Sequence, residues 1–339
     1  MISFKKYIFV SAGKVTKKKS NDLKNRQKSE QKPLFTKKNT YFFSFFAKNW
    51  DNRKIFCNFA LEMEKYLQLH NNLLDLSHPR VMAIVNVSAD SFYTSYTTSD
   101  EEGFLSRVEE MIRAGADILD VGACSTRPNS TPVSSEAEWQ SLSRALQMIR
   151  AHWADIPISV DTFRAHIADL ALQHGADMIN DVYGGEADTC MWEVVKRHNV
   201  PYVLTHSHAI ADTTSGQYDS TLSQTLDYLQ GRLSYLHRSG VKDVVVDPGF
   251  GFGKTLEQNY ALLRQLEVLH VLHAPILVGV SRKSMLYKPL QTTPQDVLPA
   301  TTAAHMIALQ KGANILRVHD VEAARQAIMV YELTYQTSK

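Results

Sequence analysis

Short apolar runs recur along the chain from about residue 76 to the C-terminus, and helical patterns separate them. Each run is five or six residues long and most are rich in Val, Ile and Leu, which is typical of strands buried on both faces of a parallel sheet. The eight runs span residues 81–86, 117–122, 157–161, 177–181, 201–205, 243–247, 275–280 and 314–318. The pattern predicts eight parallel strands.

Helical patterns fill the intervals between the runs. Ser99 with Glu102, and Ser135 with Glu138, have the spacing of a capping box, and each pair precedes apolar residues at helical intervals. Glycine then ends several helical stretches and leads into the next run, because glycine takes the left-handed conformation beyond a helix at little cost. These glycines are Gly115, Gly175, Gly240 and Gly312. A helix–glycine–strand join therefore repeats along the chain.

Eight strand–helix units in the 264 residues from 76 to 339 predict an α/β fold of the (β/α)8 TIM barrel type, for which about 250 residues are typical. A doubly wound open sheet is the alternative, because periodicity alone does not show whether a sheet closes. The barrel is predicted over 76–339, with a lead-in over 63–75.

The charge is distributed unevenly. The chain has a formal net charge of +2, but residues 1–62 hold 15 Lys and Arg against 4 Asp and Glu, whereas residues 63–339 hold 22 against 31. Lys-, Asn- and Ser-rich sequence buries too little apolar surface to fold. We therefore predict that 1–62 is a disordered basic extension, or the product of a mis-called start with translation beginning at Met63. Contact with nucleic acid or a membrane surface is the less favoured interpretation of this extension.

Targeting signals are weak in this extension. Its apolar stretches at 7–10 and 41–46 fall short of the ~18 residues of a membrane span, and no convincing secretory signal is present. An organellar transit peptide stays open as an alternative. The three cysteines, Cys57, Cys124 and Cys190, lie far apart, which argues against a disulfide framework or a structural zinc site. This distribution favours the reducing cytoplasm.

Polar residues stand at the carboxyl ends of the predicted strands. A single Asp in such a place is often only a helix cap. Polar groups at the ends of many strands are better explained by an active site, because barrel enzymes build their sites from strand ends and the loops that follow. The predicted site residues are Asn86, Asp161, Asn180, Asp247, Lys283, Arg317 and His319.

These residue types suit a flat, hydrogen-bonding heterocycle. Two carboxylates and an amide pair with ring N–H and amino groups, while a lysine donates to a ring carbonyl or nitrogen. Hydrogen bonds to charged groups contribute about 1.5–3 kcal/mol each, so three or four select such a ring. Arg317 and His319 stand at the end of the eighth strand, where barrels commonly hold phosphate. Asn86 and Asp161 offer oxygen ligands of the kind that Mg²⁺ prefers.

The stretch DPGFGFGKT at 247–255 looks like a phosphate cradle but does not match one. The P-loop pattern needs a glycine where Pro248 stands, and the third glycine of the dinucleotide pattern falls on Lys254. The pair His206 and His208 likewise suggests a transition-metal site, but no third ligand is evident. Cys124 as a nucleophile is also disfavoured, because an unpaired loop thiol is more often inert.

Seven motifs together resemble the dihydropteroate synthase family. They run in the family's order and spacing from about residue 73 almost to the C-terminus: IVNVSADSFY (84–93), GADILDVGACSTRP (115–128), ISVDT (158–162), MIND (178–181), DPGFGFGKTLEQNYALL (247–263), LVGVSRKSM (277–285) and LRVHDV (316–321). The resemblance implies a TIM barrel transferase of folate biosynthesis. Such an enzyme joins 6-hydroxymethyl-7,8-dihydropterin diphosphate to 4-aminobenzoate and releases pyrophosphate and 7,8-dihydropteroate.

The resemblance also implies a role for each matching residue. The pterin is held by Asp161, Asn180, Asp247 and Lys283, and the diphosphate with Mg²⁺ is met by Asn86, Arg317 and His319. The catalytic set is Asp161, Asp247, Lys283 and Arg317. Two loops and the residue after Lys283 handle 4-aminobenzoate, which implies roles for Asp90, Ser91, Phe92, Thr126, Arg127, Pro128 and Ser284. The family commonly forms homodimers, and sulfonamides target it.

The two loops depart from the family's usual pattern. Ser88-Ala89 replaces Thr-Pro, Thr94 stands where a second acid is usual, and Ala123-Cys124 and Asn129 replace a Gly-Glu pair and a glycine. A non-catalytic pterin-binding paralogue is therefore one alternative. A pterin-dependent methyltransferase domain is another, although such domains lack the Ser-Arg-Lys-Ser run found at 281–284.

Overall fold

The computed structural model describes residues 66–70, 72–87, 100–123, 133–207 and 221–335. The predicted extension over 1–62 lies outside these residues. Over the described part of the chain, no helix combines the length and the apolar character needed to cross a bilayer.

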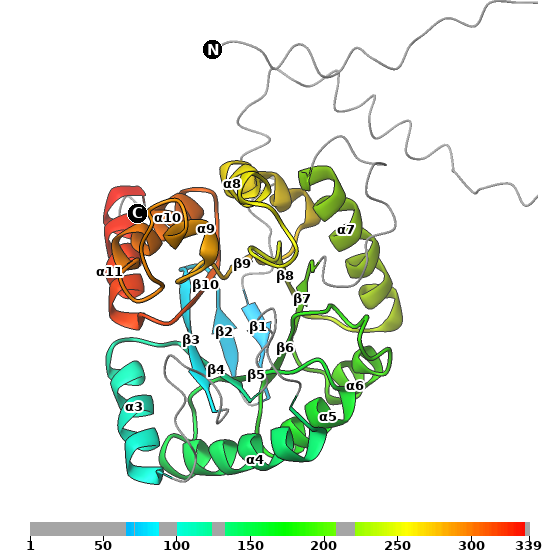
Figure 1. Ribbon diagram of the computed structural model, residues 1–339. Helices are drawn as coiled ribbons and strands as arrows, with labels where there is room; N and C mark the ends of the chain where they lie inside the picture. Colours follow the sequence, from blue (N-terminus) through cyan, green and yellow to red (C-terminus); the bar gives the residue numbers. More distant parts are fainter. Residues whose placement is uncertain (1–65, 71, 88–99, 124–132, 208–220, 336–339) are drawn as a thin grey trace, which may run out of the picture. The chain divides into compact units, whose positions relative to one another are not determined.

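The described chain alternates strands and helices, as predicted (Figure 1). The strands are β1 (Tyr66–Gln68), β2 (Leu73–Asp75), β3 (Arg80–Asn86), β4 (Ile118–Gly122), β5 (Ile158–Asp161), β6 (Met178–Asp181), β7 (Tyr202–Thr205), β8 (Val244–Asp247), β9 (Leu277–Val278) and β10 (Ile315–Val318). The helices are α3 (Glu101–Arg113), α4 (Ser135–His152), α5 (Ala165–Gln173), α6 (Met191–His198), α7 (Thr221–Ser239), α8 (Leu256–Arg264), α9 (Ser284–Tyr287), α10 (Leu298–Gln310) and α11 (Val321–Tyr335), with a 3-10 helix η1 at Leu266–Leu272.

Eight of the strands form one parallel sheet in the order β8-β7-β6-β5-β4-β3-β10-β9. A parallel bridge between Val246 and Ile276 joins β8 to the residue before β9, so the sheet nearly closes on itself. The helices surround it (Figure 1). The predicted TIM-type barrel is confirmed, and the open-sheet alternative is wrong.

The helix ends follow the predicted glycines but not the predicted caps. Gly115, Gly175, Gly240 and Gly312 all have φ between 86° and 100°, the left-handed region that favours glycine. Helix α4, however, is capped by Ser134, whose side chain accepts from the N–H of Ala137, and Glu138 is buried beside Arg164 instead of closing a capping box. Helix α3 is capped by Asp100. A capping box that was not predicted opens α8, between Thr255 and Gln258.

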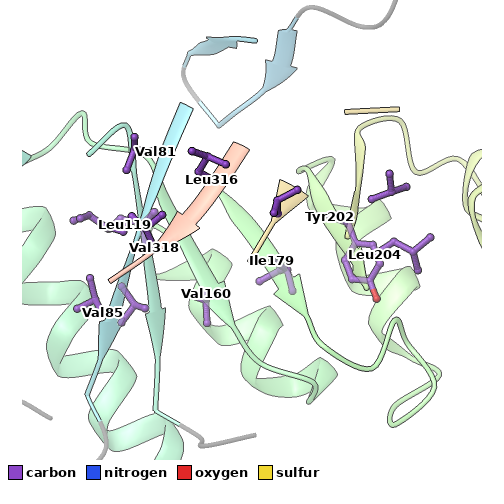
Figure 2. Close-up of a cluster of buried hydrophobic side chains, with 14 of the residues drawn as sticks. Val81, Val85, Leu119, Val160, Ile179, Tyr202, Leu204, Leu316 and Val318 are labelled. Carbon is purple, nitrogen blue, oxygen red and sulfur yellow. The ribbon is translucent and has the colours of Figure 1, made fainter. Parts of the chain in front are cut away.

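Alternation along the strands separates two apolar layers. One set of strand residues packs with the helices in a single large cluster, and Figure 2 shows part of this outer layer: Val81, Val85, Leu119, Val160, Ile179, Tyr202, Leu204, Leu316 and Val318. The residues between them form a second cluster: Met82, Ile118, Met178, Val203, Val245, Leu277 and Ile315. Because neighbouring strand residues face opposite sides, this second layer fills the barrel interior.

A hairpin of β1 and β2 completes the inner layer. Leu67, Leu69, Leu74 and Leu76 belong to the same cluster as the inward-facing strand residues and are nearly inaccessible to solvent. These leucines come just before β3, and the inner-layer residues they contact stand early in their strands. The hairpin therefore covers the amino-terminal end of the barrel and leaves the carboxyl ends of the strands to build a site.

Candidate active site

The same alternation places polar side chains inside the barrel, beyond the apolar layer. Two residues after four of these inward apolar residues comes an inward charged or amide residue: Asp120 after Ile118, Asn180 after Met178, Asp247 after Val245 and Arg317 after Ile315. Asp161 follows the outward-facing Val160 and is the register partner of Asn180. The barrel thus has an apolar floor with a charged layer directly above it.

Arg317 is the centre of this charged layer. Its Nε lies 2.6 Å from Asp120 Oδ2, and its Nη2 lies 2.5 Å from Asp161 Oδ2. Asn180 Nδ2 donates to the same Asp120 oxygen at 3.1 Å. One guanidinium, two carboxylates and one amide from four strands therefore form a continuous network.

Asp120 was missed by the sequence analysis. It stands in the middle of the run 117–122, which was interpreted only as a strand, and it is fully buried. The available signal was its register, since Asp120 pairs with Ser159, two residues before Asp161 on the neighbouring strand. A charged residue inside an otherwise apolar strand is stable only when it is paired.

Burial controls the protonation of the carboxylates in this layer. Desolvation raises the pKa of Asp161 to about 7, although the Arg317 guanidinium opposes the shift and Asp120 reinforces it. Burial likewise raises the pKa of Asp247, against the effect of Lys283. Burial alone would lower the pKa of Arg317, but Asp120 and Asp161 outweigh it and raise that pKa, so the guanidinium stays charged. Perturbed groups that cluster in this way are typical of functional sites.

Lys283 enters the site from the turn after β9. Its ammonium group donates to the carbonyl of Phe250 and lies 4.4 Å from the centre of the Phe252 ring. Burial lowers its pKa to about 8, and Asp247 works in the opposite direction, so the lysine is charged at neutral pH. A Cβ on Gly279 would lie 3.9 Å from both Lys283 Nζ and Arg317 Cβ, so the absence of a side chain there leaves space between these two cations.

The glycine-rich stretch after β8 is a rim loop built around Lys254. The buried Lys254 ammonium donates to the carbonyls of His206 and Gly249, both at 2.9 Å. Gly249 has φ 70°, and a Cβ there would come within 1.9 Å of the His206 carbonyl oxygen, so only glycine fits. Its N–H donates to Asp247 Oδ1 at 2.7 Å. Because Lys254 is committed to the protein's own carbonyls, the loop orients Asp247 and does not form a nucleotide cradle.

The other predicted residues lie around this centre or outside the described chain. Asn86 ends β3 and is half-buried, His319 follows β10, and Ser284 begins α9. Six predicted loop residues fall outside the described residues: Asp90, Ser91, Phe92, Thr126, Arg127 and Pro128. The altered positions Ser88, Ala89, Thr94, Cys124 and Asn129 also fall outside, as does His208.

His206 is held by neighbouring side chains. Its Nδ1 lies 2.9 Å from the Thr225 hydroxyl, and its ring centre lies 4.9 Å from that of Tyr228. Over the described ranges, no group of three or more His, Cys, Asp or Glu side chains is arranged to hold a metal ion. Neither finding supports a transition-metal site at His206.

Comparisons with known proteins agree with this geometry. A family model described as "Pterin binding enzyme" matches residues 82–319. The chain is similar to the dihydropteroate synthase of Escherichia coli strain K12, with 36% identity over 265 residues that cover 77% of this chain and 93% of that protein. Among solved structures it is similar to Xanthomonas albilineans dihydropteroate synthase with 4-aminobenzoic acid, with a TM-score of 0.74 and 34% identity over 81% of this chain and 99% of the other. It is also similar to the Thermus thermophilus enzyme in complex with 6HMPPP, with a TM-score of 0.69 and 37% identity over 80% and 100% of the two chains.

Proposed function

The chain belongs to the pterin-binding family of dihydropteroate synthases, and from this premise we propose how its residues carry out the reaction. Its function is that of a dihydropteroate synthase in folate biosynthesis. The reaction forms a C–N bond between the methylene carbon of 6-hydroxymethyl-7,8-dihydropterin diphosphate and the amine of 4-aminobenzoate. Pyrophosphate leaves with the electrons of the broken C–O bond.

For the pterin, we assign the inward-facing side chains of the charged layer. Asp161, Asn180 and Asp247 offer acceptors and an amide to the ring edge, and Lys283 donates to a ring acceptor. Asp120 joins this set, because it fixes both Asn180 and Arg317. The observation that carries the proposal is the network of Arg317 with Asp120 and Asp161. It places paired charges inside the barrel, directly above the apolar floor, where the flat polar ring of the pterin would bind.

For the diphosphate we assign Asn86, Arg317 and His319. Asn86 is the last residue of β3, and Arg317 is the last but one of the neighbouring strand β10, which His319 follows directly. Asn86 brings a neutral amide oxygen, which fits Mg²⁺ because that ion is usually held by few protein ligands together with substrate phosphates and water. Bound there, Mg²⁺ would neutralise phosphate oxygens as negative charge builds up on the leaving pyrophosphate.

The protein side chains act on charge that changes during the reaction. The methylene carbon becomes cationic as pyrophosphate departs, and Arg317 and His319 stabilise the departing negative charge. Asp161 and Asp247 favour the electron-rich pterin that delocalises the cation. The weakly basic arylamine then attacks the carbon, and its nitrogen loses one proton to give the neutral secondary amine. We assign 4-aminobenzoate to Ser284 and to the predicted loop residues Asp90, Ser91, Phe92, Thr126, Arg127 and Pro128, whose closure would keep water from the cation.

Pyrophosphate release by the purified protein tests this assignment directly. We expect release to require both the pterin diphosphate and 4-aminobenzoate. Chelation of divalent cations should abolish it, and added Mg²⁺ should restore it, because the amide of Asn86 would be the principal protein ligand. Asn86→Ala should raise the Mg²⁺ concentration needed for half-maximal rate. An unchanged Mg²⁺ requirement in this variant would contradict the placement of the ion at Asn86.

We also propose that the protein is a homodimer. Exposed apolar side chains stand on α8, η1, α10 and α11, of which α8 and α11 both contact α10: Leu256, Tyr260, Val271, Ile307, Met329, Val330 and Leu333. Exposed apolar surface of this kind is typical of a protein–protein interface.

The dimer is testable by analytical ultracentrifugation. The wild-type protein is expected to sediment as two copies of the 38.3 kDa chain. Met329 and Leu333 are four residues apart on one face of α11, and Leu333 is 81% exposed. Replacing both by Glu should place like charges in the interface and yield monomers. A wild-type monomer at micromolar concentration would contradict the proposal.

For location we propose the cytoplasm. The widely spaced cysteines support this, and the Cys190 thiol is free and exposed, as expected in a reducing compartment. An organelle with a reducing interior is the alternative that the basic residues 1–62 leave open.

A further inference from the structure

Two consecutive residues after β9 bind two consecutive residues after β10. Ser281 Oγ lies 3.0 Å from His319 Nδ1 and also accepts the backbone N–H of His319 at 3.2 Å. Next to this pair, Arg282 Nε donates to Asp320 Oδ2 at 2.9 Å, and a second guanidinium nitrogen contacts the other carboxylate oxygen. The strand ends that carry Lys283 and His319 are therefore joined side by side.

The hydrogen bonds of Ser281 determine where the imidazole proton lies. A hydroxyl group has one hydrogen to donate, and the Ser281 oxygen already accepts the backbone N–H of His319. Ser281 is only 4% exposed, so its hydrogen needs a protein acceptor. Among the residues that the structure describes, the acceptor within hydrogen-bond distance of Ser281 Oγ is His319 Nδ1. A neutral imidazole that accepts at Nδ1 carries its single proton on Nε2.

We propose that Ser281 is a positioning residue that holds His319 as the Nε2–H tautomer. The inference rests on the assignment of His319 to the diphosphate made above. An Nε2–H group donates to a phosphate oxygen, whereas an Nε2 lone pair would repel it. Before the substrate binds, Ser281 thus already holds an N–H donor in place. This donor stabilises the negative charge that later develops on the leaving group. This is the role that second partners of a histidine play at metal centres.

The surrounding turn is arranged to hold Ser281 in place. Lys283 N–H donates to the Val280 carbonyl at 3.2 Å, which closes a four-residue turn over 280–283. Arg282 has φ 55°, a conformation that non-glycine residues adopt only when their surroundings hold them there. The ion pair with Asp320 and a hydrogen bond from Arg282 N–H to Thr301 Oγ1 at 3.4 Å supply that restraint. A turn restrained on both sides keeps the hydroxyl of Ser281 aimed at the His319 ring.

Nitrogen NMR of the imidazole ring tests the tautomer without any activity measurement. Full-length protein labelled with ¹⁵N-histidine would be measured at about pH 8.5, about two units above the ordinary imidazole pKa. Signals would be assigned by their loss in His319→Gln. We expect a protonated Nε2 and an unprotonated Nδ1 in the wild type and in Ser281→Thr. In Ser281→Ala the two shifts should move toward each other as the tautomers mix. Unchanged shifts in Ser281→Ala would overturn the proposal.

Kinetics separate positioning from a general structural effect. Ser281→Ala should lower kcat/KM about three- to tenfold, the range expected for one hydrogen bond, and Ser281→Thr should recover most of it. In a His319→Ala background, Ser281→Ala should cause no further loss, because the ring it orients is gone. An equal loss in both backgrounds would overturn the proposal.

The same variants distinguish the inference from the function it rests on. Full turnover in His319→Ala would refute the assignment of His319 to the diphosphate, and with it the purpose of the tautomer. Unchanged ¹⁵N shifts in Ser281→Ala, together with a large loss in His319→Ala, would refute only the role of Ser281.

Discussion

Replacing Lys283 by alanine is expected to lower turnover by at least about a hundredfold, the loss typical when one preorganised charged contact is removed from a site. The ammonium group is buried next to Asp247 and Arg317, and it is held by the Phe250 carbonyl and the face of the Phe252 ring. Its removal takes away the cation that most opposes the effect of burial on the pKa of Asp247, and it removes a donor to the pterin. The measurement is kcat and KM from pyrophosphate release at saturating Mg²⁺.

Lys288→Ala is the matched control for this variant. Lys288 is exposed and follows the end of α9, five residues beyond Lys283. Its removal should leave both kinetic constants unchanged, since an exposed lysine of this kind touches neither substrate. Full activity in Lys283→Ala would remove Lys283 from the proposed pterin site.

The barrel can be predicted from the sequence because its signals are local. Each signal depends on about 20 neighbouring residues or fewer. This holds for the apolar runs, for the helical spacing between them and for glycines with a left-handed φ such as Gly115 and Gly175. The cap of α4 was misplaced by one residue for the same reason. Both Ser134 and Ser135 suit a cap locally, and the choice is decided by Glu138, which is buried against Arg164 and Thr162 from the next strand–helix unit.

The interactions inside the site depend on contacts between distant parts of the chain. The sequence predicts Arg317 as a site residue but not its partners, Asp120 and Asp161, which lie 197 and 156 residues away. Asp120 was missed because its partners come from other strands. Lys254 stands in what looks like a phosphate motif, whereas its ammonium group binds the carbonyls of Gly249 and of His206, the residue after β7. Arg317 and Lys254 stand out in the sequence by residue type, but the partners of all three side chains follow from barrel closure and strand register.

Asp161→Asn is expected to lower kcat/KM by at least about a hundredfold while leaving the protein no less stable at pH 8. The amide keeps the shape of the side chain but loses the charge that binds the pterin and pairs with Arg317. Arg317 retains Asp120 as its partner, so no cation is left unpaired. The buried carboxylate is close to Asp120, and the loss of one of two neighbouring negative charges relieves repulsion between them.

The pH dependence of the wild type supplies a second measurement. Burial raises the pKa of Asp161 to about 7 in the folded protein, above its unfolded value, so the folded state binds this proton more tightly. The group therefore favours folding at low pH, and that contribution is lost as the pH rises through about 7. Pterin binding has the opposite sign, because it needs the carboxylate and weakens as the pH falls below about 7. With the pKa of Lys283 lowered to about 8, kcat/KM is expected to be bell-shaped between these values.

Asp177→Asn is the matched control for Asp161→Asn, and its expected effect falls on stability instead of activity. Asp177 lies directly before β6, at the opposite end of this strand from Asn180 and Asp181. It binds Arg150 at 2.6 Å and accepts the N–H of Ile158 at 2.9 Å. The partly buried ion pair supports the fold, so its neutralisation should lower the melting temperature and leave kcat/KM and its pH profile intact. Asp161→Asn should abolish the acidic limb of the profile and keep the melting temperature at pH 8. If Asp161→Asn instead retained the acidic limb, another group would control pterin binding, and the charged layer around Arg317 would be structural.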